Sequence, residues 1–178
     1  MTKKIFFITI TFIISWLMAS CEKWPKDDAL TLEKRICTDN SLRFDGYYYE
    51  MNAVSNSFSE TYFLYRDGTI LRFCGTPDNK PPFTFIEDLI LSGELSYKNS
   101  KSLWGVFQIK DTSIIINRWF PGNGGLREAL LQGVILNDST FKIISTTETT
   151  TGTVHHNNDL FHFHAFSPKP DSTNVFIP

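Results

Sequence analysis

Short runs of Tyr, Phe, Ile, Val and Thr, each ended by turn-forming residues, recur along most of this chain. Such spacing is typical of β-strands joined by tight turns, and short links favour antiparallel neighbours. Asp67-Gly68 is the clearest hairpin signal, because a type I′ turn needs the positive φ that these two residues tolerate. We predict eight strands, near residues 42–50, 61–66, 69–74, 103–110, 113–120, 128–136, 140–145 and 160–166. Closure best removes the exposed edges of such a sheet, so the predicted fold class is all-β: an eight-stranded antiparallel, mostly up-and-down barrel.

One segment between the strands has a helical pattern. Thr84 and Glu87 have the spacing of a capping box, and Gly93 is suited to end a helix. The apolar side chains between them share one helical face, so we predict a short helix over 84–92. It either fills the core as a plug or covers the barrel mouth as a lid, and the plug is favoured.

The first 21 residues follow a different pattern. Lys3 and Lys4 precede an uncharged, mostly apolar run over 5–18, and the run leads into Met18-Ala19-Ser20-Cys21. Fourteen helical residues span about 21 Å, short of the roughly 30 Å hydrocarbon core, so a cleaved signal peptide over 1–20 is favoured. The last four residues resemble the lipobox of bacterial lipoproteins, which implies lipidation at Cys21. An uncleaved anchor and an ordinary secretory signal are the alternatives, and all three place the body outside the cytoplasm.

The predicted organisation is a signal over 1–20, a lipidated cysteine and spacer over 21–40, and a barrel domain over 41–178. Residues 22–28 are polar and contain Pro25, so we expect them not to pack. Lys26-Asp27-Asp28 is similar to the lysine-plus-acid signals that send lipoproteins of the Bacteroidota to the cell surface; the alternative is a solvated linker. The expected location is the cell envelope, as an outer-membrane lipoprotein facing the periplasm or the surface.

Charge and cysteine content narrow the partners. Loss of Lys3 and Lys4 with the signal takes the formal charge from −2 to −4, which argues against a nucleic-acid partner. With Cys21 lipidated, Cys37 and Cys74 remain as an even pair in an oxidising compartment. A disulfide between them is therefore predicted, with two buried free thiols as the alternative.

Several segments together resemble a known family. They are Phe44-Asp45-Gly46-Tyr47-Tyr48-Tyr49, Tyr65-Arg66-Asp67-Gly68-Thr69, Trp104-Gly105-Val106-Phe107-Gln108-Ile109, the segment from Gly133 to Phe141, and Asp171-Ser172-Thr173-Asn174. In strand rhythm and recurring turns they are similar to the lipocalin-like lipoproteins of the Bacteroidota, which have a calycin-type barrel. The resemblance implies the barrel fold and a membrane tether, and it carries no catalytic signature.

A barrel of this size is either filled with side chains or holds one small ligand. The predicted ligand-lining residues are Tyr48, Phe107, Trp119 and Phe163, for a small apolar molecule, and each of them also fits an ordinary core position. No cofactor is expected. Two hypotheses remain: a tethered carrier or sensor that holds a small apolar molecule in the barrel, and an interaction module with a filled barrel that binds another envelope protein.

Metal binding and catalysis find little support in the sequence. His162 and His164 share a strand face, and His155-His156 lie in the segment 146–158, which has no apolar period and is predicted to be a mobile loop. We expect solvent-facing imidazoles rather than a zinc site.

The chain has no Gly-x-Ser-x-Gly, no His-Glu-x-x-His and no phosphate-binding glycine loop, so no enzyme is predicted. The pairs Glu94 with Glu128 and Glu87 with Asp88 are interpreted as solvated surface acids.

Overall fold

A computed structural model describes residues 26–52, 57–74, 81–93 and 98–178. The predicted signal peptide and the predicted lipidation site at Cys21 lie outside these residues. Within them, no helix is both long and apolar enough to cross a lipid bilayer.

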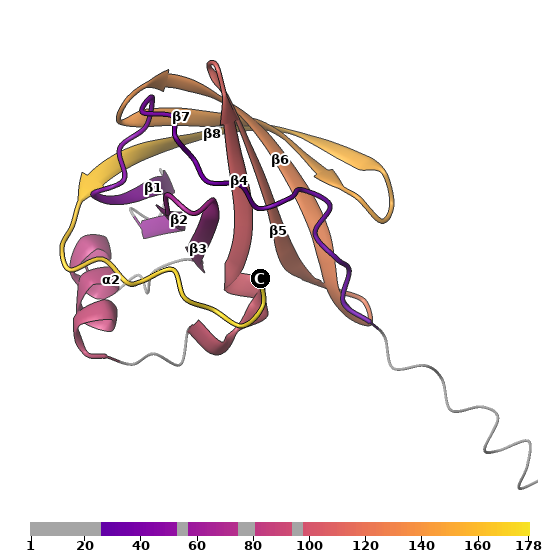
Figure 1. The fold of residues 1–178 in the computed structure, drawn as a ribbon, viewed down its shortest axis with the longest axis horizontal. Coiled ribbons are helices and arrows are strands. Elements are labelled where there is room, and N and C mark those ends of the chain that lie inside the picture. The colour runs from indigo at the N-terminus through magenta and orange to yellow at the C-terminus, as the bar shows by residue number, and fades with distance from the viewer. Residues whose placement is uncertain (1–25, 53–56, 75–80, 94–97) are drawn as a thin grey trace, which may run out of the picture.

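The described chain forms a closed antiparallel β-barrel in which each strand pairs with its neighbours in sequence, and the first strand pairs with the last (Figure 1). The strands are β1 (Gly46–Asn52), β2 (Ser57–Leu64), β3 (Thr69–Cys74), β4 (Trp104–Lys110), β5 (Ser113–Gly122), β6 (Gly125–Asn137), β7 (Thr140–Glu148) and β8 (Thr153–Ala165). The predicted fold class is confirmed. A turn does join β2 and β3 at Asp67-Gly68, but the predicted type I′ is wrong, because Gly68 has a positive φ of 87° and Asp67 does not. A 3-10 helix, η2 (Lys101–Leu103), leads into β4.

The two faces of the sheet carry separate apolar clusters, because successive side chains of a strand point to opposite sides. On β1, Tyr48 belongs to the cluster inside the barrel, whereas Tyr47 and Tyr49 belong to a second cluster on the outer wall. Three segments cover that outer wall over β1–β6: the helix α2 (Pro82–Leu91), the C-terminal tail after β8, and the N-terminal residues before β1 (Figure 1).

The helix lies on the outside of the barrel, so both predicted roles, plug and lid, are wrong. The Phe83 ring meets Tyr49 and Phe58 on the outer wall at centroid distances of 5.0 and 4.9 Å. The predicted capping box is not formed either: the residue at the helix N-cap is Pro81, and no side chain caps the first turn. Gly93 does follow the helix, with a φ of 69° that suits glycine.

The predicted mobile loop over 146–158 is also wrong, because β7 and β8 extend through it as a long hairpin. Its turn contains Gly152, with a φ of 70°. Most side chains here are exposed or half-buried on both faces, so no apolar alternation marks the strands. The run of Thr residues, which favour extended backbone, was the available signal.

The predicted disulfide is absent: Cys37 and Cys74 are both free. The Cys37 N–H donates to the Arg66 carbonyl at the β2–β3 turn, 2.8 Å away. Cys74 ends β3 at the other end of the strand, about 17 Å along it at the usual rise per residue. Since the two Cα atoms of a disulfide lie within about 7 Å, the two cysteines are placed too far apart to pair.

The expectation that Asp27 and Asp28 belong to an unpacked spacer is wrong as well. Both carboxylates accept backbone N–H bonds from β6, from Leu126 and Glu128 respectively. Further along, Leu30 and Leu32 pack into the outer cluster. The N-terminal segment is therefore part of the folded domain from Asp27 onward.

Candidate functional site

The barrel interior has two ends of different character. We call the end that contains the β2–β3, β4–β5 and β6–β7 turns the aromatic end. There Phe141 stacks on Phe161 at a centroid distance of 4.8 Å and meets Tyr48 at 5.1 Å. The Tyr48 hydroxyl is also fixed, because it donates to the Asp138 carbonyl and accepts from the Arg43 N–H, both at 2.9 Å. This end is filled with packed side chains.

The opposite end, which contains the β5–β6 and β7–β8 turns, is hollow and charged, and we call it the charged end. A cavity of about 310 Å³ lies there. Its lining residues come from four strands and are Arg72, Arg118, Phe120, Pro121, Ala129, Thr146 and Glu148. This volume is at the small end of the range of ligand pockets.

Two arginines share one carboxylate at the base of this cavity. Arg72 Nη1 and Arg118 Nη2 each lie 2.9 Å from the same oxygen, Oε1 of Glu60. The other oxygen of Glu60 accepts the hydroxyl of Tyr62. The Arg118 contact crosses the barrel, since β5 and β2 are separated by two strands. One carboxylate balances one guanidinium, so this group of three side chains retains one excess positive charge.

The strand register explains why these charges meet inside the barrel. Arg72 stands opposite Tyr62 on β2, and Arg118 stands opposite Gly105 on β4. A Cβ atom at Gly105 would lie 3.0 Å from the Arg118 Cβ and 2.6 Å from a backbone oxygen. Glycine at this position therefore leaves the space in which the Arg118 side chain enters the interior.

Each guanidinium has a nitrogen still available for a partner. The Nε atoms of Arg72 and Arg118 are buried and have no hydrogen-bond acceptor in the described part of the chain. A buried donor without an acceptor costs about 1 to 3 kcal/mol, and more when it is charged. Arg72 and Arg118 therefore carry donor capacity that the fold leaves unused next to the cavity.

Acidic side chains near Arg72 and Arg118 reduce the positive charge of the cavity. Glu50 stands opposite Glu60 in the β1–β2 register. Burial, and after it the carboxylates of Asp159 and Glu60, together raise the pKa of Glu50 to about 7. Glu148, at the rim, accepts from the Thr151 hydroxyl at 3.1 Å. Protonation of Glu50 near neutral pH would make the interior more positive.

The four predicted ligand-lining residues lie away from this cavity. Tyr48, Phe107 and Phe163 lie inside the barrel at the aromatic end. Tyr48 and Phe107 belong to the inner cluster, and Phe163 packs against it. Phe107 also borders a second pocket, of about 520 Å³, beside Cys37. Trp119 faces outward, lines a groove of about 650 Å³ under the N-terminal segment, and donates from Nε1 to the Asp28 carbonyl at 2.7 Å.

The histidines do not converge. His164 Nε2 lies 3.0 Å from Oε1 of Glu87 on α2, and His155 lies 3.6 Å from Glu148. Among the residues that the structure describes, no three His, Cys, Asp or Glu side chains are grouped in a way that could hold a metal ion. Of the acids interpreted as surface groups, Glu128 is buried, with an exposed fraction of 2%, and Glu94 lies outside the described residues.

Sequence reasoning missed Glu60, Arg72 and the role of Arg118. The signal was charge within strand patterns: Arg72 stands between the apolar Leu71 and Phe73. Arg118 precedes Trp119 in the sequence, but the cation over that ring is Lys101, 4.5 Å from its centroid. A charged residue between apolar neighbours in a strand has two explanations: the charge faces solvent, or it faces a polar interior of the barrel.

The chain matches no protein-family model, and searches of curated proteins and of solved structures found no match. The class of protein is therefore defined by its own structure. It is a closed, eight-stranded antiparallel β-barrel, consistent with a calycin-like fold, with an aromatic end and a charged end that holds a cavity.

Proposed function

We propose that this protein is a non-catalytic binding protein of the cell envelope that holds a small molecule with an acidic group in the charged end of its barrel. The observation that carries the proposal is the cavity of about 310 Å³ bordered by Arg72 and Arg118, two guanidiniums that share the single carboxylate of Glu60. Guanidinium groups suit a carboxylate or phosphate, because their fork of donors matches the two oxygens.

The rest of the lining favours a ligand with a short apolar part. Phe120, Pro121 and Ala129 supply apolar surface next to the arginines. The aromatic end beyond them is filled, so there is no room for a long chain along the barrel axis. The purely apolar ligand expected from the sequence is therefore refined to a small amphiphile whose acidic group meets the arginine pair.

The envelope location and the tether rest on the sequence. The charged start, the apolar run and the Met18-Ala19-Ser20-Cys21 sequence favour export and lipidation at Cys21. Lipid attachment holds a protein on a bilayer, since each buried methylene contributes about 0.8 kcal/mol. The proposal is thus a binding barrel held at a membrane.

The first experiment is native mass spectrometry of the chain from residue 22, exported to the periplasm, before and after mild organic extraction. A co-purifying mass that extraction removes would support a binding barrel and would reveal the ligand class. Titration with octanoate and with octan-1-ol then separates recognition of the acidic group from burial of the chain, because the two probes differ only in that group.

Arginine variants test where the acidic group binds. We expect R72Q and R118Q each to weaken octanoate binding at least tenfold, which is about 1.4 kcal/mol, and to leave octan-1-ol little changed. The matched control is R43Q, because Arg43 lies at the aromatic end over the Phe163 ring. Equal affinity of octanoate for wild type and both variants would reject the site.

The second candidate function is an interaction module, and one observation favours it. On the outer wall of β7 and β8 the side chains of Ile144, Val154 and Leu160 are exposed, whereas His164, near the end of β8, contacts α2. Exposed apolar side chains gathered on one face are typical of contact surfaces. A bare mass in the native spectrum together with no binding of octanoate would favour this function.

A further inference from the structure

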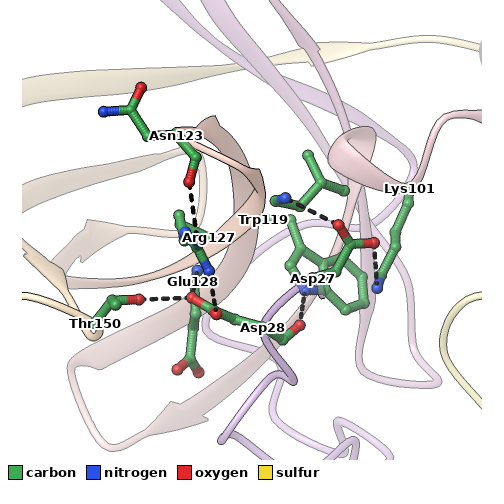
Figure 2. Close-up of polar contacts among 9 residues, drawn as sticks. Asp27, Asp28, Lys101, Trp119, Asn123, Arg127, Glu128 and Thr150 are labelled. Atoms are coloured by element: carbon green, nitrogen blue, oxygen red, sulfur yellow. Dashed lines mark hydrogen bonds and ion pairs between the residues drawn. The ribbon is translucent and has the colours of Figure 1, made fainter. Parts of the chain in front are cut away.

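The N-terminal segment is bonded to the barrel wall at the charged end, beside the β5–β6 turn (Figure 2). Asp27 Oδ1 accepts the Leu126 N–H at 2.9 Å, and its Oδ2 pairs with Lys101 Nζ at 3.0 Å. The backbone hydrogen bond from Leu126, then that from Lys101, lowers the pKa of Asp27. This carboxylate is fixed by two partners on different elements, β6 and η2.

Asp28 joins two hairpins at the same place. Its Oδ1 pairs with Arg127 Nη1 at 3.0 Å, and its Oδ2 accepts the Thr150 hydroxyl at 2.6 Å and the Glu128 N–H at 3.1 Å (Figure 2). The hydrogen bond from Thr150, followed by that from Glu128, lowers the pKa of Asp28. Because Thr150 lies in the β7–β8 turn, Asp28 connects that turn to the start of β6.

Two buried side chains hold the next residues. Glu128 Oε1 accepts both the N–H and the hydroxyl of Thr31 at 2.6 Å, and Asn117 Oδ1 accepts the Leu32 N–H at 3.0 Å. Glu128 and Asn117 are 2% and 0% exposed. We call Asp27, Asp28, Thr31 and Leu32, with their partners, the clamp. It fixes the point from which the chain leads toward its N-terminus.

We propose that the clamp holds the charged end of the barrel toward a lipid bilayer, so that the cavity exchanges its ligand with that membrane. The inference rests on the proposed tether at Cys21. Five residues lie between Cys21 and Asp27, and the six steps of chain that join the two span at most about 21 Å. The charged end therefore stays within about 21 Å of the anchored cysteine.

The aromatic end lies too far from the clamp to be held at the bilayer in the same way. β6 runs from Leu126, at the clamp, to Asn137, beside the β6–β7 turn, which is about 36 Å along the strand. With a strand tilt of about 40°, this is about 28 Å along the barrel axis. Because that distance exceeds the reach of the tether, the barrel cannot stand on its aromatic end, and in an upright orientation the charged end is the one that faces the bilayer.

Paramagnetic relaxation tests this orientation on the complete lipidated protein in nanodiscs that contain a gadolinium-chelating lipid. We expect relaxation of the Asn123 and Thr150 amides, at the charged end, to exceed that of the Thr112 and Ser139 amides, at the aromatic end, at least fivefold. Equal relaxation at both ends, or the reverse order, would overturn the inference and leave the tether intact.

Two matched variants show that the clamp and the tether length set the orientation. Insertion of twelve Gly and Ser residues between Pro25 and Lys26 should remove the difference between the ends, and the double variant D28A/T31A should reduce it by lengthening the free chain. Retention of the full difference in both would overturn the inference. The mass of the purified protein is the separate check on lipidation: an unmodified Cys21 would reject both the tether and the orientation, and ligand binding would remain to be judged by the octanoate titration.

Discussion

The two ends of the barrel differ in the side chains that the same strands place at inward positions. At the aromatic end, inward positions carry Tyr48, Phe141 and Phe161, which are at most 1% exposed and contact one another. At the charged end, inward positions of the same barrel carry Glu60, Arg72 and Arg118 around a cavity. We infer that the aromatic end supplies stability, whereas the charged end gives up packing for recognition.

The two ends are expected to contribute differently to the stability of the fold. Close packing stabilises the aromatic end, whereas burial of three charged groups is at best weakly stabilising and is strongly destabilising if one partner is lost. Function is consequently expected where packing is poorest. The following variants measure each side of this contrast.

The largest effect is expected at the aromatic end. F141A removes a ring that packs against Tyr48 and Phe161, and we expect it to lower the free energy of unfolding by about 4 kcal/mol. Urea denaturation measures this loss. F120A, at the half-buried cavity wall, is the control and should cost about 1 kcal/mol. Equal losses in the two variants would remove the contrast between the ends.

The next effect is expected from the shared carboxylate. E60Q leaves Arg72 and Arg118 without an ionised partner, so we expect a loss of about 2 to 3 kcal/mol, less than for a fully buried pair because Glu60 is partly exposed. The freed guanidiniums should bind octanoate more tightly than in the wild type, so added octanoate should recover part of the lost stability. A variant that is destabilised but gains nothing from octanoate would indicate a purely structural ion cluster.

The sequence predicted the barrel because its signals are local: short β-rich runs and turns such as Asp67-Gly68. It did not predict the cavity, because Arg118 and Glu60 meet across the barrel, and only the register of several strands brings them together. The helix could be predicted from its apolar face, but its place could not, since Phe83 fits an outer wall as well as an interior. The clamp was missed because Asp27 and Asp28 have the composition of a linker.

A smaller effect is expected where the clamp meets the outer wall of the charged end. T31A removes the hydroxyl that donates to the buried Glu128 carboxylate and should cost about 1.5 kcal/mol by urea denaturation. T38A is the matched control, because Thr38 is exposed and lies beyond the clamp. We expect octanoate affinity to be unchanged in both variants, because the clamp is outside the barrel. A loss of binding in T31A would show that wall and cavity are coupled.

The smallest effect concerns pH and isolates the interior of the charged end. Burial, with Asp159 and Glu60 nearby, raises the folded-state pKa of Glu50 from 4.5 to about 7. The folded protein therefore binds more protons than the unfolded chain between these values, so stability falls as pH rises from about 4.5 to about 7 and is constant above. We expect E50Q to match the wild type at pH 4.5 and to be more stable at pH 8 by about 1 kcal/mol, a value reduced for partial exposure, or about 3 °C in Tm.

The groups that face Glu50 are the carboxylates of Glu60 and Asp159 and, beyond Glu60, the guanidiniums of Arg72 and Arg118. Ionisation of Glu50 should therefore also weaken octanoate binding above pH 7. Thermal melts and titrations of both proteins at pH 4.5 and pH 8 measure these differences. A stability difference that is the same at both pH values would show that Glu50 is solvated, and the charged end would then owe its field to the arginine pair and Glu60 alone.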